Sequence, residues 1–340
     1  MKVVFFDVDS LTKKYIEKNS NCNCKIIMCE KSLSTLTKVE RAKYEDADII
    51  SIFSVSADVL GASILEHFPK LKLIATRSTG FDHIDIKYCK NRNIAVVNVP
   101  KYGEATVAEY AMGLLLNLSR KIILVRNDMY NGHYEVKNYI GFDLYGRTIG
   151  IIGTGAIGRH MIKLAKGFGM EVLAYDLFPN AEVERIMGFK YVNLDDIYHK
   201  SDIISLHAPS TKENFHLLNK TAFEKMKKDV IIINTARGDL IDTEELYRAI
   251  IQGKVAGAGL DVLEDEETLI YDDIFIDEKP ITMDFALNTI INNKLLRLPN
   301  VIITPHTAFN SIDAVNRILA TTIKNIESFS VGRLVNSVIK

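Results

Sequence analysis

The 340-residue chain lacks several features that mark specialised classes of protein. Its 42 Lys and Arg residues nearly balance 43 Asp and Glu residues, so nothing favours binding to nucleic acid or to an anionic membrane. No apolar run is long enough to span a bilayer, and the first residues turn acidic at Asp7, too early for a secretory signal. There are only 7 prolines and no repeats or low-complexity tracts. We therefore expect a cytoplasmic globular protein that acts on a small molecule.

Cysteine is also scarce, with only Cys22, Cys24, Cys29 and Cys89 in the chain. Three of them lie in one short stretch, but none forms a C-x-x-C pair, and no histidine lies close enough to complete a zinc site. We therefore expect no metal site and a reduced set of thiols, as in cytoplasmic proteins.

Strand-like and helix-like segments alternate along most of the chain, whose length fits two domains. Apolar, β-branched runs predict strands in the first part, and amphipathic stretches at 37–47 and 57–67 predict helices between them. This alternation predicts a parallel sheet with helices on both faces. The predicted strands of the first series are 25–28, 48–53, 71–76 and 95–99, after an initial strand at the N-terminus.

A second series follows a helical stretch that we predict over 104–131. Its predicted strands are 148–152, 171–175, 202–207, 230–234, 256–261 and 301–304, and a last helix is predicted over 311–331. We predict an α/β fold with two Rossmann-like, doubly wound parallel-sheet domains and a cleft between them. We expect a discontinuous, flavodoxin-like first domain (1–101 plus 307–340) and a second, Rossmann domain (102–306); the family resemblance described below implies that the first domain binds the substrate.

A glycine-rich turn in the second series has the pattern of a dinucleotide-binding site. It follows an apolar strand and opens a helical stretch, which is the context the pattern needs. Gly153 permits the tight turn, Gly155 lets backbone approach a pyrophosphate, and Gly158 lets the helix pack close to the sheet. A turn of this kind that binds nothing is the weaker alternative. The turn reads Gly153, Thr154, Gly155, Ala156, Ile157, Gly158.

Asp176 ends the next predicted strand, where a carboxylate takes the two ribose hydroxyls. A carboxylate there would repel a 2′-phosphate, and no arginine follows immediately. The sequence therefore predicts NAD as the cofactor rather than NADP.

Residues that follow the later strands converge on one edge of the predicted sheet, where ligands of doubly wound sheets bind. Arg237 presents a planar fork suited to a carboxylate. His306 can donate a proton to a carbonyl oxygen, and Glu266 is a candidate neighbour that favours its protonated form. Taken singly, Arg237 could be a surface residue, His306 a loop cap, and Glu266 part of a solvated acidic run. His207 is interpreted as structural.

These motifs together resemble those of the D-isomer specific 2-hydroxyacid dehydrogenase family. The resemblance covers essentially the whole chain and is strongest over 77–111 and 147–308. It implies that Arg237, Glu266 and His306 are catalytic. It further implies that Thr79 and Gly80 hold the substrate carboxylate through their backbone, and that Tyr102 is an active-site tyrosine. The implied cofactor contacts beyond the glycine turn are Asp176, Ala208, Pro209, Asn214, Thr235, Ala236, Arg237, Asp261 and His306.

The long stretch between Glu266 and His306 is similar to the D-lactate dehydrogenase branch of that family. This branch implies an NAD-dependent reduction of pyruvate by a homodimer. Two positions depart from its pattern: Phe309 is followed by Asn310 where an aromatic pair is common, and Phe53 stands where tyrosine is common. Because both are expected near the substrate side chain, a longer, branched keto acid such as 2-ketoisocaproate stays open. An NAD-sensing co-repressor is a third alternative, and the chain lacks the tails expected of one.

Overall fold

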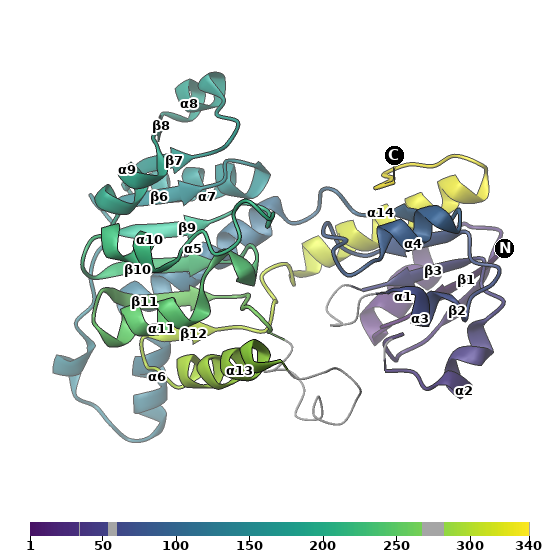
Figure 1. The fold of residues 1–340 in the computed structure, drawn as a ribbon, viewed down its shortest axis with the longest axis horizontal. Coiled ribbons are helices and arrows are strands. Elements are labelled where there is room, and N and C mark those ends of the chain that lie inside the picture. The colour runs from purple at the N-terminus through teal and green to yellow at the C-terminus, as the bar shows by residue number, and fades with distance from the viewer. Residues whose placement is uncertain (34, 54–59, 267–281, 340) are drawn as a thin grey trace. The chain divides into compact units, whose positions relative to one another are not determined.

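The computed structural model describes residues 1–33, 35–53, 60–266 and 282–339. The chain forms two compact units, Met1–Tyr102 with Asn310–Lys340, and Gly103–Phe309. Each contains one parallel sheet flanked by helices (Figure 1). The fold is therefore α/β with two doubly wound sheets, as predicted. The unit boundaries lie one and three residues beyond the domain boundaries expected from the sequence.

The first unit has a five-stranded sheet in the order β2-β1-β3-β4-β5, and every neighbouring pair is parallel. This order requires a crossover helix between consecutive strands. The strands are β1 (Lys2–Phe5), β2 (Lys25–Met28), β3 (Ile49–Ile52), β4 (Leu73–Thr76) and β5 (Ala95–Val97). The helices are α1 (Ser10–Asn19), α2 (Lys38–Arg41), η1 (Ala42–Tyr44), α3 (Ala62–Leu65), α4 (Ile86–Asn91) and α14 (Ile312–Ser330).

Both faces of this sheet are buried, which explains why its strands read as nearly continuous apolar runs. Successive side chains point to opposite faces, so Ile49 and Ile50 belong to different core clusters. Ile323 and Ile326 of α14 join the cluster on the Ile49 face. The last helix of the chain therefore packs on the first sheet, as predicted.

The second unit has a seven-stranded parallel sheet in the order β12-β11-β10-β9-β6-β7-β8. The order reverses at β6, so the turn after β6 lies at the switch point where such sheets bind ligands. Its strands are β6 (Thr148–Ile152), β7 (Glu171–Tyr175), β8 (Lys190–Tyr191), β9 (Ile203–Leu206), β10 (Val230–Asn234), β11 (Val255–Leu260) and β12 (Val301–Ile303).

Helices cover both faces of the second sheet, and two large apolar clusters lie between them and the strands. Ile231 and Ile233 face one cluster, and Ile232 faces the other. The elements are α5 (Glu104–Arg120), α6 (Ile122–Tyr130), η2 (Val136–Tyr139), α7 (Ala156–Gly167), α8 (Ala181–Met187), α9 (Leu194–Lys200), α10 (Lys220–Lys225), η3 (Gly238–Leu240), α11 (Thr243–Ile251) and α13 (Met283–Leu296).

The prediction of one helix over 104–131 was wrong. The segment is two helices, because Lys121 adopts a left-handed conformation (φ 53°) that ends α5 and starts α6. The predicted helix over 37–47 is the shorter pair α2 and η1. Of the helix predicted over 57–67, α3 covers Ala62–Leu65, and residues 57–59 lie outside the described ranges.

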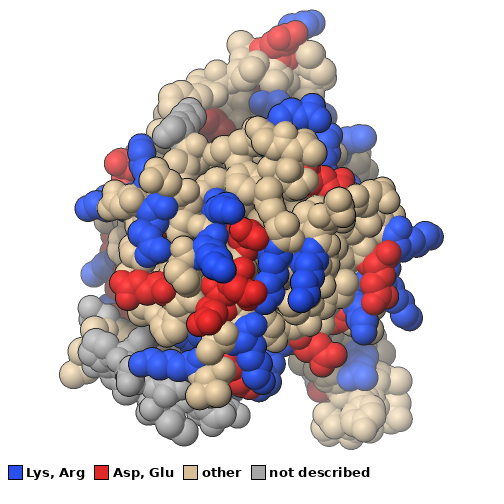
Figure 2. Space-filling model, turned by 90° about the vertical axis from the view of Figure 1, so that its right-hand side faces the viewer, with Lys and Arg blue, Asp and Glu red and all other residues tan. Residues whose placement is uncertain are grey.

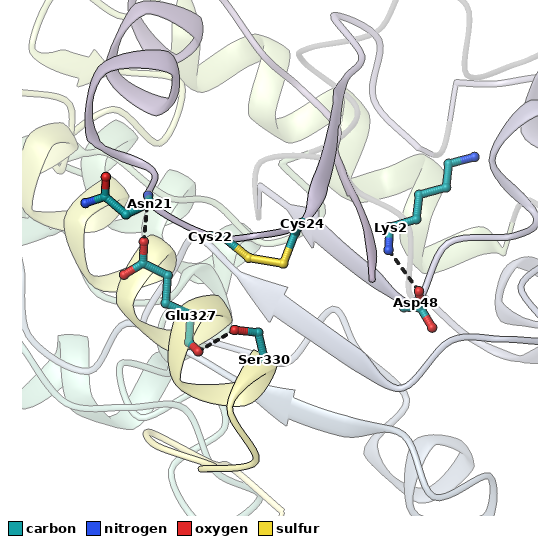
Figure 3. Close-up of a disulfide and its surroundings, with 7 residues drawn as sticks. All are labelled: Lys2, Asn21, Cys22, Cys24, Asp48, Glu327 and Ser330. Carbon is teal, nitrogen blue, oxygen red and sulfur yellow. Dashed lines mark hydrogen bonds between the residues drawn. A yellow bond between two sulfur atoms is a disulfide. The ribbon is translucent and has the colours of Figure 1, made fainter.

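The prediction of four reduced thiols was also wrong. Cys22 and Cys24 form a disulfide between α1 and β2 (Figure 3). The chain bends at residues 23–24, and the two Cα atoms lie 5.1 Å apart, within the usual range for a disulfide. Both sulfurs pack against the core cluster beneath α14, and the neighbouring Asn21 N–H donates to Glu327 Oε1 of that helix. Cys29 and Cys89 are free and buried.

The surface reflects the nearly balanced charge of the sequence. On the face drawn in Figure 2, Lys and Arg side chains are interspersed with Asp and Glu side chains. Among the described residues, no helix is both long and apolar enough to cross a membrane. No group of three or more His, Cys, Asp or Glu side chains within the described ranges could hold a metal ion.

Candidate active site

The three glycines after β6 differ in what surrounds them. Gly153 has φ +95°, and a Cβ there would lie 2.7 Å from the backbone of His207 and Ala208. A Cβ on Gly158 would lie 2.0 Å from Gly153 O, so α7 packs directly on the turn. A Cβ on Gly155 would meet no protein atom within 4 Å. The second glycine therefore keeps a space open at the start of α7, which begins without a side-chain cap. This is the cradle that a pyrophosphate requires.

Asp176 follows β7 and is held against this turn. Its Oδ2 accepts from Thr154 N at 2.7 Å and from Thr154 Oγ1 at 2.8 Å, and Phe178 N donates to Oδ1 at 2.9 Å. Partial burial raises the pKa of this carboxyl, but those hydrogen bonds and the charge of Arg159 outweigh it and leave the pKa below its usual range. Asp176 is thus an ionised acceptor fixed beside the glycine turn, where the ribose carboxylate was predicted.

His306 and Glu266 come into direct contact at the neighbouring strand ends. His306 Nδ1 donates to Glu266 Oε1 at 2.8 Å, and each side chain is about one-third exposed (34% and 32%). Glu266 Oε2 in turn accepts from Leu263 N at 3.2 Å. Because the contact uses Nδ1, Nε2 is the ring atom left to exchange a proton with a ligand.

Asp261 directly follows β11 and is 1% exposed. Its carboxylate accepts from Thr304 Oγ1 at 2.6 Å, Thr307 N at 2.9 Å and Ala308 N at 2.8 Å. Burial raises the pKa of Asp261 above its usual value, and the three hydrogen bonds oppose that rise. The sequence predicted a cofactor contact here and missed this role. Asp261 shapes the loop that presents His306. The backbone N–H of His306 donates to the backbone carbonyl oxygen of Asp261.

Arg237 follows β10 on a turn that a buried asparagine shapes. Asn234 Nδ2 donates to Arg237 O at 2.8 Å, and Asn234 Oδ1 accepts from Ala236 N at 3.0 Å. A Cβ on the next residue, Gly238, would lie 2.0 Å from Leu263 C. The turn that carries Arg237 therefore packs against the backbone of the loop that carries Glu266.

The remaining predicted cofactor contacts lie on the same loops. Ala208 and Pro209 lie in the loop after β9, and Thr235 and Ala236 follow β10. Asn214 closes the loop after β9, since its Nδ2 donates to Pro209 O at 2.8 Å and its Oδ1 accepts from Thr211 N at 2.7 Å.

His207 is structural, as predicted. Its ring donates to or accepts from Ser205 Oγ at 2.9 Å, and burial lowers its pKa to about 4. The ring is therefore neutral near pH 7.

Among the predicted substrate residues of the first unit, Phe53 lies near the buried Arg77. Its guanidinium lies 5.5 Å from the Phe53 ring centroid and donates to Phe6 O. Thr79 Oγ1 donates to Val99 O at 2.8 Å, and Ser78 Oγ donates to Gly80 O at 2.6 Å. The backbone of 79–80 is thus held in place from both sides.

Tyr102 is the last residue of the first segment of this unit, and its carbonyl accepts from Arg317 Nε of α14. Phe309 ends the second unit.

The glycine cradle, the fixed carboxylate and the His–Glu pair at one strand edge together define a nicotinamide-dependent oxidoreductase. Residues 112–308 match the family model described as the D-isomer specific 2-hydroxyacid dehydrogenase, NAD binding domain. The chain belongs to this family and is an NAD-dependent oxidoreductase.

Known proteins match the chain over most of its length. A D-lactate dehydrogenase of Escherichia coli is 38% identical over 271 residues, which cover 79% of this chain and 80% of that protein. The structure of a D-lactate dehydrogenase from Aquifex aeolicus, complexed with NAD and lactic acid, is 34% identical, with a TM-score of 0.83 and 99% of both chains covered. A D-2-hydroxyisocaproate dehydrogenase structure is 30% identical, with a TM-score of 0.82 and 100% of both chains covered.

Proposed function

We propose that this enzyme reduces pyruvate to D-lactate with NADH. The contact between His306 Nδ1 and Glu266 Oε1 is the observation that carries the proposal, because it leaves an imidazole oriented to give a proton from Nε2. The choice of pyruvate rests on the likeness to D-lactate dehydrogenases and on the branch that the stretch between Glu266 and His306 resembles.

We propose that the cofactor lies along the second sheet from the glycine turn to the ends of β9, β10 and β11. The open space at Gly155 fits its pyrophosphate, and the ionised Asp176 fits its ribose hydroxyls. When bound as NADH, the cofactor supplies the hydride. The residues proposed to contact it are Gly153, Thr154, Gly155, Ala156, Ile157, Gly158, Asp176, Ala208, Pro209, Asn214, Thr235, Ala236, Arg237, Asp261 and His306.

Three residues of the second unit are proposed to act on the keto acid. Arg237 binds its carboxylate by a two-point contact. His306 donates a proton from Nε2 to the keto oxygen, and Glu266 holds the ring and favours its protonated form. The negative charge of Glu266 also stabilises the imidazolium in the reverse direction, when His306 receives a proton from the hydroxyl group.

The substrate roles of five other residues stay predictions from the resemblance. Thr79 and Gly80 would offer backbone N–H groups to the carboxylate. The substrate's own side chain would meet the aromatic rings of Phe53, Tyr102 and Phe309. The hydrogen bonds that hold 78–80 support this role, since a carboxylate site needs donors that do not reorganise.

A longer, branched substrate is the second candidate. The likeness to D-2-hydroxyisocaproate dehydrogenase and the two departures, at Phe53 and after Phe309, support this second candidate. Turnover of pyruvate, 2-ketoisocaproate and phenylpyruvate with NADH and with NADPH decides between them. Highest kcat/KM for pyruvate with NADH supports the proposal, and preference for 2-ketoisocaproate replaces it with the second candidate.

We further propose that the enzyme is a cytoplasmic homodimer. A group of exposed apolar side chains on α6 and the segment after it supports the dimer, because exposed apolar side chains often pack at interfaces. Its most exposed members are Tyr130, Tyr134, Val136, Ile140 and Tyr145. Light scattering after gel filtration should give a mass twice the 38.3 kDa of one chain. The double variant Val136→Asp with Ile140→Asp should shift the measured mass toward that of the monomer.

A further inference from the structure

A second histidine–carboxylate pair lies beside the proposed catalytic one. His216 Nε2 lies 2.9 Å from Glu264 Oε1, and the side chains are only 27% and 16% exposed. Glu264 precedes Glu266 by two residues, and its Oε2 accepts from Thr243 Oγ1 at 3.3 Å. The second pair therefore joins His216 to the loop that carries Glu266.

The backbone of His216 belongs to a different loop. His216 N donates to Asp239 O at 2.8 Å, and Leu218 N donates to Leu240 O at 3.0 Å. The segment 216–218 thus pairs with the residues that continue directly from Arg237. His216 is joined by its backbone to the Arg237 loop and by its side chain to the Glu266 loop.

Backbone conformation shows how tightly this region is held. His216 (φ 51°), Asp265 (φ 52°) and His306 (φ 51°) all adopt left-handed conformations, which non-glycine residues keep only when their surroundings impose them. From α13, Asn292 Nδ2 donates to Glu264 O at 2.9 Å, and Asn288 Nδ2 donates to Asp265 Oδ2 at 2.9 Å. The loop between Asp261 and Glu266 is therefore clamped between α13 and His216.

We propose that His216 and Glu264 are a positioning pair that sets Arg237 in register with Glu266 and His306. This inference rests on the proposed function of those three residues. The pair ties the carboxylate-binding loop to the proton-donating pair, and a misplacement of about 1 Å in such a site costs about 100-fold in rate. The glycine turn after β6 and Asp176 make none of these contacts, so we expect the pyrophosphate and ribose ends of the cofactor site to be unchanged when the pair is lost.

The Nε2 contact allows a selective test at His216. The amide of glutamine reaches about where Nε2 lies, whereas the shorter asparagine reaches about where Nδ1 lies. His216→Asn should lower kcat per NADH-binding site by about 10-fold or more and raise the KM for the keto acid, with a smaller change in the NADH Kd than in either. His216→Gln should restore kcat to within about threefold of the original, although asparagine tolerates left-handed backbone better. His199→Asn, at an exposed histidine of α9, is the matched control and should change nothing.

Glu264 tests the same contact from its other end. Glu264→Gln keeps an acceptor for His216 and should stay near the original kcat, whereas Glu264→Ala should behave like His216→Asn. An unchanged kcat and KM in His216→Asn would overturn the proposal, as would equal losses in the asparagine and glutamine variants. His306→Ala distinguishes failure of the positioning-pair proposal from failure of the proposed function. If His306→Ala keeps full turnover, the catalytic assignment itself is wrong.

Discussion

His306 Nδ1 and Glu266 Oε1 lie 2.8 Å apart, although 40 residues separate them in the chain. They meet because β11 and β12 are adjacent parallel strands, so the segments after them leave the same edge of the sheet. Each partner has a hydrogen bond of its own. The backbone N–H of His306 donates to Asp261 O, and Glu266 Oε2 accepts from Leu263 N. The pair is therefore oriented before any substrate binds, which is what proton donation at a fixed atom requires.

Glu266→Gln tests the charge in this pair. Glutamine keeps a hydrogen-bonding group next to Nδ1 but no longer stabilises the imidazolium, so we expect kcat to fall by about 10- to 100-fold at neutral pH. The NADH Kd should stay unchanged. Glu244→Gln on α11, whose carboxylate pairs with Arg248 at the surface, is the control. Equal kcat values in the two variants would show that Glu266 has no part in proton transfer.

Arg237→Lys tests the carboxylate anchor. A lysine ammonium is a point charge and cannot replace the two parallel donors of a guanidinium. Loss of a charged hydrogen bond worth about 1.5–3 kcal/mol predicts a rise of about 10- to 100-fold in the KM for pyruvate. Steady-state kinetics at saturating NADH measure this value. If the KM does not move, another residue binds the carboxylate.

A substitution in the glycine turn should weaken NADH binding without lowering the stability of the protein. Gly155→Ala places a methyl group in space that no protein atom occupies within 4 Å, so the melting temperature should not fall. The same methyl group would occupy the proposed pyrophosphate position, so NADH affinity should drop about 10-fold or more. Gly167→Ala, in the same helix and equally open, is the control and should bind NADH normally.

The first glycine should behave differently. Gly153→Ala imposes φ +95° on alanine and drives its Cβ to 2.7 Å from the backbone of residues 207–208. We expect it to lower the melting temperature as well as NADH binding. Fluorescence titration with NADH measures binding by both glycine variants. For the second glycine, normal NADH binding by Gly155→Ala would place the cofactor elsewhere.

His207 predicts how stability changes with pH. Burial lowers its pKa to about 4, below the ordinary value of about 6.5 expected in the unfolded chain. Between these values the unfolded state binds a proton that the folded state does not, so the free energy of unfolding falls as pH falls from 6.5 to about 4.

His207→Gln removes this titration and keeps a group that can bond Ser205. Urea unfolding at pH 7 and pH 5 should therefore show a smaller loss of stability in this variant than in the original protein. His199→Gln serves as the exposed control. An identical pH dependence in all three proteins would mean that His207 is not buried neutral.

Local patterns predicted the parts of the fold that local sequence determines. The strands at β6, β7 and β10 begin and end where expected, and Gly153 and Gly158 lie in the tight turn and the close helix packing that the pattern predicted. The break at Lys121 was missed because a lysine in a left-handed conformation carries none of the usual Gly or Pro signals for a helix end.

Apart from the pairing of Glu266 with His306, the long-range contacts of the site were not predicted from the sequence. Arg237, Glu266 and His306 could be selected because each follows a strand in a recognisable motif. The contacts of Asp261 with Thr304 and of His216 with Glu264 join loops 43 and 48 residues apart, and only the packed strand order brings those loops together. The Cys22–Cys24 disulfide likewise depends on a bend that the composition did not indicate.

The proposed reaction is tested most directly by the product formed from pyruvate and NADH by the purified protein. Chiral chromatography of the mixture, with NADH oxidation followed in parallel, measures both yield and handedness. The account predicts D-lactate in a one-to-one ratio to NADH consumed, and none from His306→Ala. L-lactate, or NADH oxidation that persists in His306→Ala, would contradict it.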